Sequence, residues 1–173
     1  MRADSGGGAP IRALAVTVSN RAAAGIYADK SGPVLVGLLE ELGCRVDGPV
    51  VVPDGEPVLE VLRDAVEQGY DTVVTSGGTG LTPTDRTPEM TRRVIERDVP
   101  GIAEAIRLEG RDKVPAAILS RGLAGVAGRT LIVNLPGSTG GVRDGMAVLG
   151  RVLAHAVDQI GGGDHPRPPA DGA

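Results

Sequence analysis

One glycine-rich stretch, residues 75–89, limits the possible folds of this chain more than any other part of it. It reads TSGGTGLTPTDRTPE and follows directly on the apolar run YDTVV at 70–74, which is typical of a buried strand. The glycines at 77, 78 and 80 let the backbone turn sharply and let a ligand approach its N–H groups closely. The stretch therefore predicts a strand that ends in a phosphate-binding loop.

The end of the same stretch predicts the start of a helix. Thr87 is a candidate N-cap, Pro88 suits the first helical position and Glu89 is an acid in the first turn. This arrangement leaves Asp85 on a loop between the glycines and the helix.

Two nucleotide-binding patterns are excluded and one structural alternative stays open. No lysine lies between Lys30 and Lys113, so the stretch is not a Walker loop, and its glycine spacing is not G-x-G-x-x-G. The alternative is a loop that only makes a tight strand-to-helix turn. Four threonines and an acid in the same loop exceed what such a turn requires.

The rest of the chain alternates strand-like and helix-like segments, which predicts an α/β fold: a three-layer αβα sandwich with a mostly parallel central sheet. Cap and stop signals favour Ser31 as the N-cap of the first long helix and Asp54, taken alone, as the cap of the second. The expected strands are 11–18, 45–52, 70–74, 114–120 and 129–135, the last two as an antiparallel hairpin, and the expected helices are 32–42, 56–69, 88–97, 100–110 and 139–160.

Polar loops follow the strands that end near residues 18, 52, 74 and 134. Ligands of parallel sheets bind at the carboxyl edge of the strands. Ser19, Asp54, residues 76–85 and residues 134–138 are therefore expected to meet at one edge.

Composition limits the domain organisation and the classes of partner. The 173 residues predict one domain at 11–161 between flexible segments 1–10 and 162–173. With no Phe or Trp, only Tyr27 and Tyr70 could stack on bases, and the net charge is −4 with scattered cations, so we expect no nucleic-acid partner. No apolar run suits a membrane span or signal peptide, which predicts no membrane association and a cytoplasmic location.

Residue types also exclude two kinds of chemistry. Cys44 is the single cysteine, so neither a disulfide nor a thiolate metal site can form within the chain, and we expect it to be a small buried apolar residue. His155 lies in the last predicted helix and His165 in the tail, so no Ser or Cys has a plausible histidine base for triad hydrolysis. An anion-binding loop flanked by Asp54 and Asp85 favours Mg²⁺-assisted phosphoryl or nucleotidyl transfer instead.

Six motifs in order carry a resemblance to a known family. They are VSNR at 18–21 with DKSG at 29–32, PD at 53–54, the stretch 75–89, VPGIAEAIR at 99–107, LSR at 119–121 and NLPGS at 134–138. By these motifs the chain is similar, over residues 11–161, to the molybdenum cofactor biosynthesis proteins of the MogA/MoaB type, and it looks most like the MogA branch. The signature of this family also occurs in the G domain of gephyrin and in the plant molybdopterin-adenylylating domain.

The resemblance implies a function and a set of site residues. The family joins the terminal phosphate of molybdopterin to the α-phosphate of ATP and releases pyrophosphate. Asp85 and Asp54 would be the catalytic carboxylates, which hold Mg²⁺ or orient the attacking phosphate, and Glu104 is a further candidate. The pterin side would be lined by Asn134, Pro136, Gly137, Ser138 and Ser120, with Arg121 as a further candidate. The substrate-binding residues would be Ser19, Ser76, Gly77, Gly78, Thr79, Gly80, Thr84, Ser120, Asn134, Pro136, Gly137 and Ser138.

The resemblance also implies partners and shows one departure. It predicts a homotrimer, with ATP and molybdopterin as substrates and Mg²⁺ as cofactor. A molybdate-insertion domain does not fit into the chain, so a separate protein would insert molybdate. Position 20 is Asn where many relatives carry Asp, which puts a metal or nucleotide role of that loop in doubt.

Two other functions stay open. A protein of the MoaB type could bind molybdopterin or serve as a scaffold without catalysis, and a nucleotide-sensing regulator is a second alternative. Two acids beside an anionic ligand give a pure binding protein no advantage, so Asp54 and Asp85 favour the enzyme. A regulator would need an output surface, and neither a basic face nor a partner helix is evident.

Overall fold

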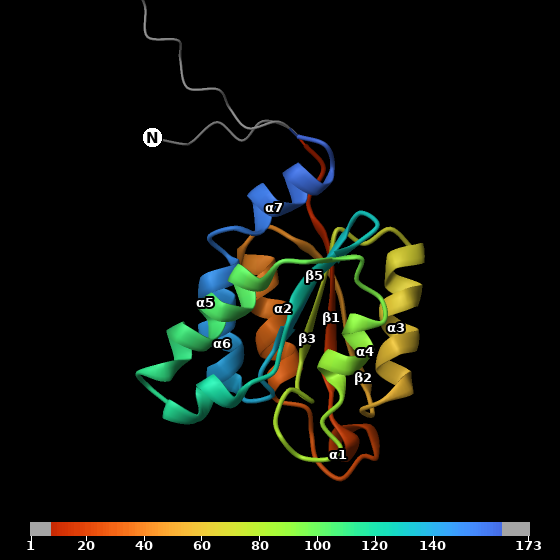
Figure 1. Cartoon of the computed structure of the whole chain (residues 1–173). Helices are drawn as coiled ribbons and strands as arrows, with labels where there is room; N and C mark the ends of the chain where they lie inside the picture. The colour runs from red at the N-terminus through yellow and green to blue at the C-terminus, as the bar shows by residue number, and fades with distance from the viewer. Residues whose placement is uncertain (1–7, 164–173) are drawn as a thin grey trace, which may run out of the picture.

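A six-stranded sheet forms the centre of the computed structural model, which describes residues 8–163 (Figure 1). Most of the two predicted flexible segments, at 1–7 and 164–173, lies outside the described residues. The strand order is β2-β1-β3-β6-β5-β4; the first four strands are parallel to one another, and β5 is antiparallel to both of its neighbours, β6 and β4. The strands are β1 Arg12–Val18, β2 Arg45–Val52, β3 Thr72–Ser76, β4 Arg97–Asp98, β5 Ala124–Ala127 and β6 Thr130–Leu135.

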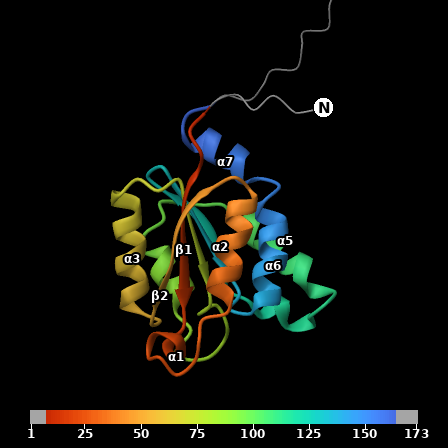
Figure 2. The ribbon, with the colours of Figure 1, turned by 180° about the vertical axis from the view of Figure 1, so that it is seen from behind.

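Helices cover both faces of the sheet, so the predicted three-layer α/β architecture is confirmed (Figures 1 and 2). α3 (Glu56–Glu67) and α4 (Thr87–Arg92) pack on one face. The other face carries α2 (Ser31–Glu41), α5 (Pro100–Arg111), α6 (Thr139–Leu149) and α7 (Leu153–Ile160).

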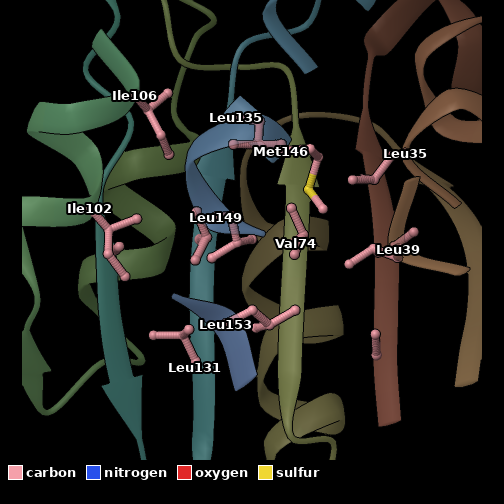
Figure 3. Packing of buried hydrophobic residues seen from close by; sticks show 14 of the residues in the cluster. Leu35, Leu39, Val74, Ile102, Ile106, Leu131, Leu135, Met146, Leu149 and Leu153 are labelled. Atoms are coloured by element: carbon pink, nitrogen blue, oxygen red, sulfur yellow. The ribbon is translucent and has the colours of Figure 1, made fainter. Parts of the chain in front are cut away.

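Alternate residues of the central strands enter two separate cores. In β3, Val74 packs with the α2, α5 and α6 side, whereas Val73 packs with the α3 and α4 side. Both are fully buried, which explains why these strands read as continuous apolar runs. Figure 3 shows Leu35, Leu39 and Leu149 among the side chains that fill the first core.

The predicted hairpin exists, but its first strand was placed too early. Residues 115–119 form a 3₁₀ helix, η1 (Pro115–Leu119), and the partner of β6 is β5. Pro115 has no backbone N–H to donate to a neighbouring strand. Ile118 and Leu119 are 58 % and 52 % exposed, so the apolar residues of this segment do not form a buried strand.

Three helix boundaries also differ from the prediction. The helix expected at 88–97 ends at Arg92, and β4 follows. The helix expected at 139–160 is divided into α6 and α7, because Arg151 and Val152 donate their N–H groups three residues back instead of four. Ser31 does not cap α2; the Asp29 carboxylate accepts the Gly32 N–H at 2.9 Å instead.

Within residues 8–163, no helix is long and apolar enough to cross a membrane.

The carboxyl ends of β1, β2, β3 and β6 meet at one edge of the sheet, where α1 (Asn20–Ala23) also lies (Figure 2). The polar loops predicted to converge therefore do so.

Candidate active site

Two adjoining hollows open at the carboxyl edge of the sheet, with volumes of about 700 and 780 Å³. We name them the α5 hollow and the α1 hollow after the helices beside them. Both are lined by Gly77, Gly78, Asp85, Gly137 and Ser138. The α5 hollow is completed by Ile106, Arg107, Lys113, Val114, Leu119, Ser120, Pro136, Arg143 and their neighbours, and the α1 hollow by Ser19–Ala22, Tyr27–Ser31, Asp54 and Ser76 among others.

The glycine loop, residues 77–86, forms the ridge between the hollows. Gly77 and Gly78 have φ angles of +99° and +66°, which favour glycine strongly. A Cβ on Gly78 would lie 2.2 Å from Thr87 Oγ1 and 2.4 Å from Asp54 Oδ2. The Gly77 N–H donates to the Leu135 carbonyl at 3.0 Å, so the N–H groups of residues 78–80 remain as candidate phosphate donors.

Asp54 joins the end of β2 to the glycine loop. Its Oδ1 accepts the Gly55 N–H at 2.7 Å, and both carboxylate oxygens accept the Arg86 N–H at 3.1 Å. The cap of α3 is Gly55, without a side-chain bond, so the interpretation of Asp54 as that cap was wrong. Burial raises the pKa of the Asp54 carboxyl, the two N–H groups oppose this shift, and the Asp85 charge adds to it.

Asp85 lies on the ridge and lines both hollows. Its Oδ2 accepts the Thr82 N–H at 3.1 Å, which closes the loop on itself. Asp54 lines the α1 hollow as well, and the Asp85 charge adds to the rise in the pKa of Asp54. A ligand that extends from the α5 hollow into the α1 hollow therefore meets Asp85 in both hollows and Asp54 in the second.

Asn20, which departs from the family pattern, supports Asp54 directly. Its amide Oδ1 accepts the Asp54 N–H at 2.9 Å. A neutral acceptor at this position holds the Asp54 backbone without placing a third negative charge beside Asp54 and Asp85.

Buried hydroxyls form the floor of the α1 hollow. Ser76, which is 1 % exposed, lies 3.1 Å from Ser31 through their hydroxyl oxygens, and Asp29 accepts the Thr17 hydroxyl at 2.8 Å. Ser19 caps α1 by accepting the Ala22 N–H at 3.2 Å. Ser19 and Ser76 therefore lie where the sequence predicted them, although part of their hydrogen-bonding capacity is already used.

Arg121 supports the glycine loop by hydrogen bonds to its backbone carbonyls. Its Nε donates to the Gly80 carbonyl at 2.9 Å, one guanidinium nitrogen donates to the Asp85 carbonyl at 2.8 Å, and another pairs with Glu89. Its backbone N–H donates to the Thr79 carbonyl at 2.8 Å. The Arg121 guanidinium lowers the pKa of the Glu89 carboxyl. Arg121 lines neither large hollow, so its place is structural support and not the predicted pterin side.

Replacing Arg121 by Lys should loosen the glycine loop, because an ammonium cannot reproduce the guanidinium fork. Loss of one or two charge-assisted hydrogen bonds should speed amide hydrogen exchange in residues 79–87 by about tenfold or more. Arg92→Lys is the matched control, since Arg92 pairs with Asp98 and forms no hydrogen bond to the glycine loop. Equal exchange in the Arg121 variant and the unaltered protein would contradict this role.

The remaining predicted binding residues divide into two groups. Ser120, Pro136, Gly137 and Ser138 line the α5 hollow, together with Thr79 and Gly80. Asn134, Thr84 and Glu104 line neither hollow.

Asn134 serves inside the fold instead of in the hollow. It is 3 % exposed, its Nδ2 donates to the Thr75 and Thr91 hydroxyls at 3.1 and 3.0 Å, and its Oδ1 accepts the Leu123 N–H at 3.2 Å. Its amide is thus a structural junction between β3, α4 and the start of β5. Thr84 and Glu104 are exposed.

Sequence reasoning missed the cations of the α5 hollow. The Arg107 guanidinium donates to the Ser120 and Gly122 carbonyls at 3.3 and 2.9 Å. Lys113 Nζ lies 2.5 Å from Asp144 Oδ1, and this contact raises the pKa of Lys113. Arg143 completes the set. Arg107 ends the motif at 99–107, but the sequence does not show that it shares a hollow with Lys113 and Arg143, because the three residues come from different segments and meet only where α5 packs against α6.

The residues present fit a magnesium ion. No group of three or more His, Cys, Asp or Glu suited to a metal occurs within residues 8–163. Mg²⁺ commonly takes only one or two protein carboxylates and completes its shell with phosphate oxygens and water. Asp54 and Asp85 meet this requirement. The Thr87 hydroxyl, which is buried beside Gly78 with no hydrogen-bond partner, is a further oxygen near Asp54.

Comparisons with known proteins agree with one another. A family model described as "Probable molybdopterin binding domain" matches residues 14–155. A protein named molybdopterin adenylyltransferase from Helicobacter pylori (strain J99) is 35 % identical over 149 residues, which cover 84 % of this chain and 85 % of that protein. The solved structure of a molybdopterin biosynthesis Mog protein from Mycobacterium ulcerans matches with a TM-score of 0.85 and 50 % identity, over 90 % of this chain and 99 % of that one.

Some relatives are much longer. The Drosophila melanogaster protein named molybdenum cofactor synthesis protein cinnamon is 39 % identical over 136 residues, which are 77 % of this chain but 23 % of that protein. The chain spans between about a fifth and a half of the length of this relative and of three others like it.

Proposed function

The chain belongs to the molybdopterin-binding domain family of molybdenum cofactor biosynthesis proteins, and from this premise we propose that it is a molybdopterin adenylyltransferase. The observation that carries the proposal is the pair of hollows that share Gly77, Gly78 and Asp85. A reaction between two phosphate-bearing substrates needs two binding sites that meet at a place where both phosphates can be held. The ridge between the hollows provides that place.

The proposed reaction joins two anions. A terminal phosphate oxygen of molybdopterin forms a bond to the α-phosphorus of ATP, the bond from that phosphorus to the β-phosphate oxygen breaks, and pyrophosphate leaves. The nucleophile is ionised at neutral pH, so the enzyme needs positioning and charge control more than a strong base. N–H groups of residues 78–80 would bind phosphate oxygens, and Asp85 would orient the attacking phosphate.

Each hollow suits one substrate. The α5 hollow combines the apolar side chains of Ile106, Val114 and Leu119 with the cations already described, which suits a planar pterin with an anionic tail. The α1 hollow holds Asp54 together with Arg21 and Lys30 and suits a nucleotide triphosphate. We assign molybdopterin to the α5 hollow and ATP to the α1 hollow.

Asp54 and Asp85 would hold Mg²⁺ at the ridge. When bound, the ion would neutralise charge on the triphosphate and on the leaving pyrophosphate. We further propose that the protein is a cytoplasmic homotrimer and that a separate protein inserts molybdate into the product.

Transfer of label from ATP to the pterin tests the proposed function. The protein is incubated with molybdopterin, Mg²⁺ and α-labelled ATP, and label in an adenylylated pterin is measured. Transfer is the expected result. Molybdopterin binding without transfer would favour the non-catalytic MoaB-type alternative, and ATP binding without either would favour the regulator.

Turnover should fall on acidification at a higher pH than an ordinary aspartate would give. Burial raises the pKa of Asp54, so its ionised form is lost as the pH falls through a value above the usual ~3.9. Asn20→Asp should move this acid limb to still higher pH, because a second charge next to the Asp54 N–H disfavours ionisation of Asp54. The profile of kcat/KM for ATP between about pH 4 and 8 measures both effects. Identical acid limbs in the two proteins would rule out Asp54 as the titrating group.

A further inference from the structure

Tyr27 offers the one aromatic ring that lines either hollow. The chain has no Phe or Trp and one other tyrosine, Tyr70. Tyr70 is 6 % exposed and is engaged in the core, where its hydroxyl donates to Asp47 at 2.7 Å. Tyr27 is 52 % exposed and lines the α1 hollow, which also contains Asp54 and Asp85. A single exposed ring in a chain so poor in aromatic residues therefore lies beside the phosphate-binding ridge.

Local contacts hold this ring in place. Arg21 donates from a guanidinium nitrogen to the Tyr27 hydroxyl at 2.5 Å, and its Cζ lies 5.5 Å from the ring centroid. The Ile26 N–H donates to the Arg21 carbonyl at 2.9 Å, which fixes the turn that carries Tyr27. The ring is thus held by α1, whose N-cap Ser19 directly follows the end of β1. An aromatic face that is held before binding costs little conformational entropy when a ligand stacks on it.

We propose that Tyr27 is the stacking platform for the adenine of ATP, with Arg21 as the residue that positions the ring. This assignment rests on the proposed function. The phosphates lie against Gly78 and the base lies on Tyr27, and both residues line the α1 hollow. Arg21 occupies one side of the ring and the purine takes the free face.

Stacking on one ring predicts a particular pattern of specificity. Every base has a π-face, so a stacking platform raises affinity without selecting among purines. Tyr27 should therefore contribute equally to ATP and GTP binding and nothing to a ligand that has phosphates but no base. Inorganic tripolyphosphate is such a ligand.

The test is calorimetric binding of Mg-ATP, Mg-GTP and Mg-tripolyphosphate to the unaltered protein and to variants of Tyr27. Tyr27→Ala should weaken ATP and GTP by about tenfold or more and leave tripolyphosphate unchanged. Tyr27→Trp should bind ATP at least as tightly as the unaltered protein. Tyr27→Phe keeps the ring but loses the hydrogen bond from Arg21, so the affinity for ATP should fall by no more than about threefold. Ile26→Ala, at a neighbouring side chain that is 70 % exposed and does not line the hollow, is the control.

Three results would overturn the proposal. ATP affinity in Tyr27→Ala equal to that of the unaltered protein would place the base elsewhere. An equal loss for tripolyphosphate would make Tyr27 a support for the loop. Weaker molybdopterin binding with unchanged ATP binding would assign the ring to the pterin. Failure of the proposed function is recognised by a different result. In that case the unaltered protein, with Tyr27 in place, would transfer no label from ATP to the pterin.

Discussion

Replacing Asp85 by Asn should leave a folded protein that still binds molybdopterin but transfers the adenylyl group at least about a hundredfold more slowly. Asp85 lines both hollows, and its carboxylate accepts the Thr82 N–H, which an amide oxygen can accept equally well. The substitution therefore removes charge at the meeting point of the substrates and little else. Its effect should be on kcat, because the charge matters most when the two phosphates are brought together.

Asp54→Asn should slow turnover to the same extent and should also make the folded protein slightly more stable. Because burial raises the pKa of Asp54 in the folded state, its contribution to stability is fully present below the unfolded pKa and is lost as the pH rises through the folded pKa. At neutral pH the ionised carboxylate is thus a cost to folding, and the neutral amide should unfold at a slightly higher temperature. Such a residue is retained for function.

Asp98→Asn is the matched control for both variants. Asp98 is an exposed acid on β4 that pairs with Arg92 and lines neither large hollow. Label transfer and thermal unfolding should be unchanged in this variant. Normal turnover in Asp85→Asn, or unfolding of that variant at room temperature, would show that Asp85 is not a catalytic carboxylate.

Much of the fold could be predicted because the central strands are buried on both faces. Val73 and Val74 enter opposite cores, so two consecutive apolar residues mark β3 as a strand that is buried on both faces. The error at 114–120 has the same origin: a short apolar run does not distinguish a buried strand from an exposed turn that precedes one. Only the burial of β5 against β6 and β4 decides between them.

Residues at the site were predictable where a loop directly follows a strand. Asp54 and residues 77–80 and 85 of the glycine loop follow this rule and line the hollows, and Ser76, the last residue of β3, lines the α1 hollow too. Asn134 does not, because it is still inside β6 and its side chain alternates to the same face as Ile132, toward α4. Arg121 is far from the glycine loop in sequence and contacts it only through tertiary packing.

Replacing Gly77 by Ala should lower the free energy of unfolding by about 2–4 kcal/mol and abolish most label transfer. The φ angle of Gly77 is +99°, and a Cβ there would lie 2.2 Å from the Val18 carbonyl oxygen. That oxygen belongs to the last residue of β1, which is held in the sheet by Val52. The clash cannot be relieved by rotation of a side chain, so the glycine loop or the strand end must move.

Gly37→Ala is the control that separates this effect from the general cost of changing a glycine. Gly37 lies within α2, and a Cβ there would meet nothing within 4 Å. Alanine should stabilise the helix by about 0.5–1 kcal/mol. Chemical denaturation measures both values. If Gly77→Ala were as stable and active as Gly37→Ala, the ridge between the hollows would not require the backbone path that brings Asp54, Asp85 and the phosphate donors together.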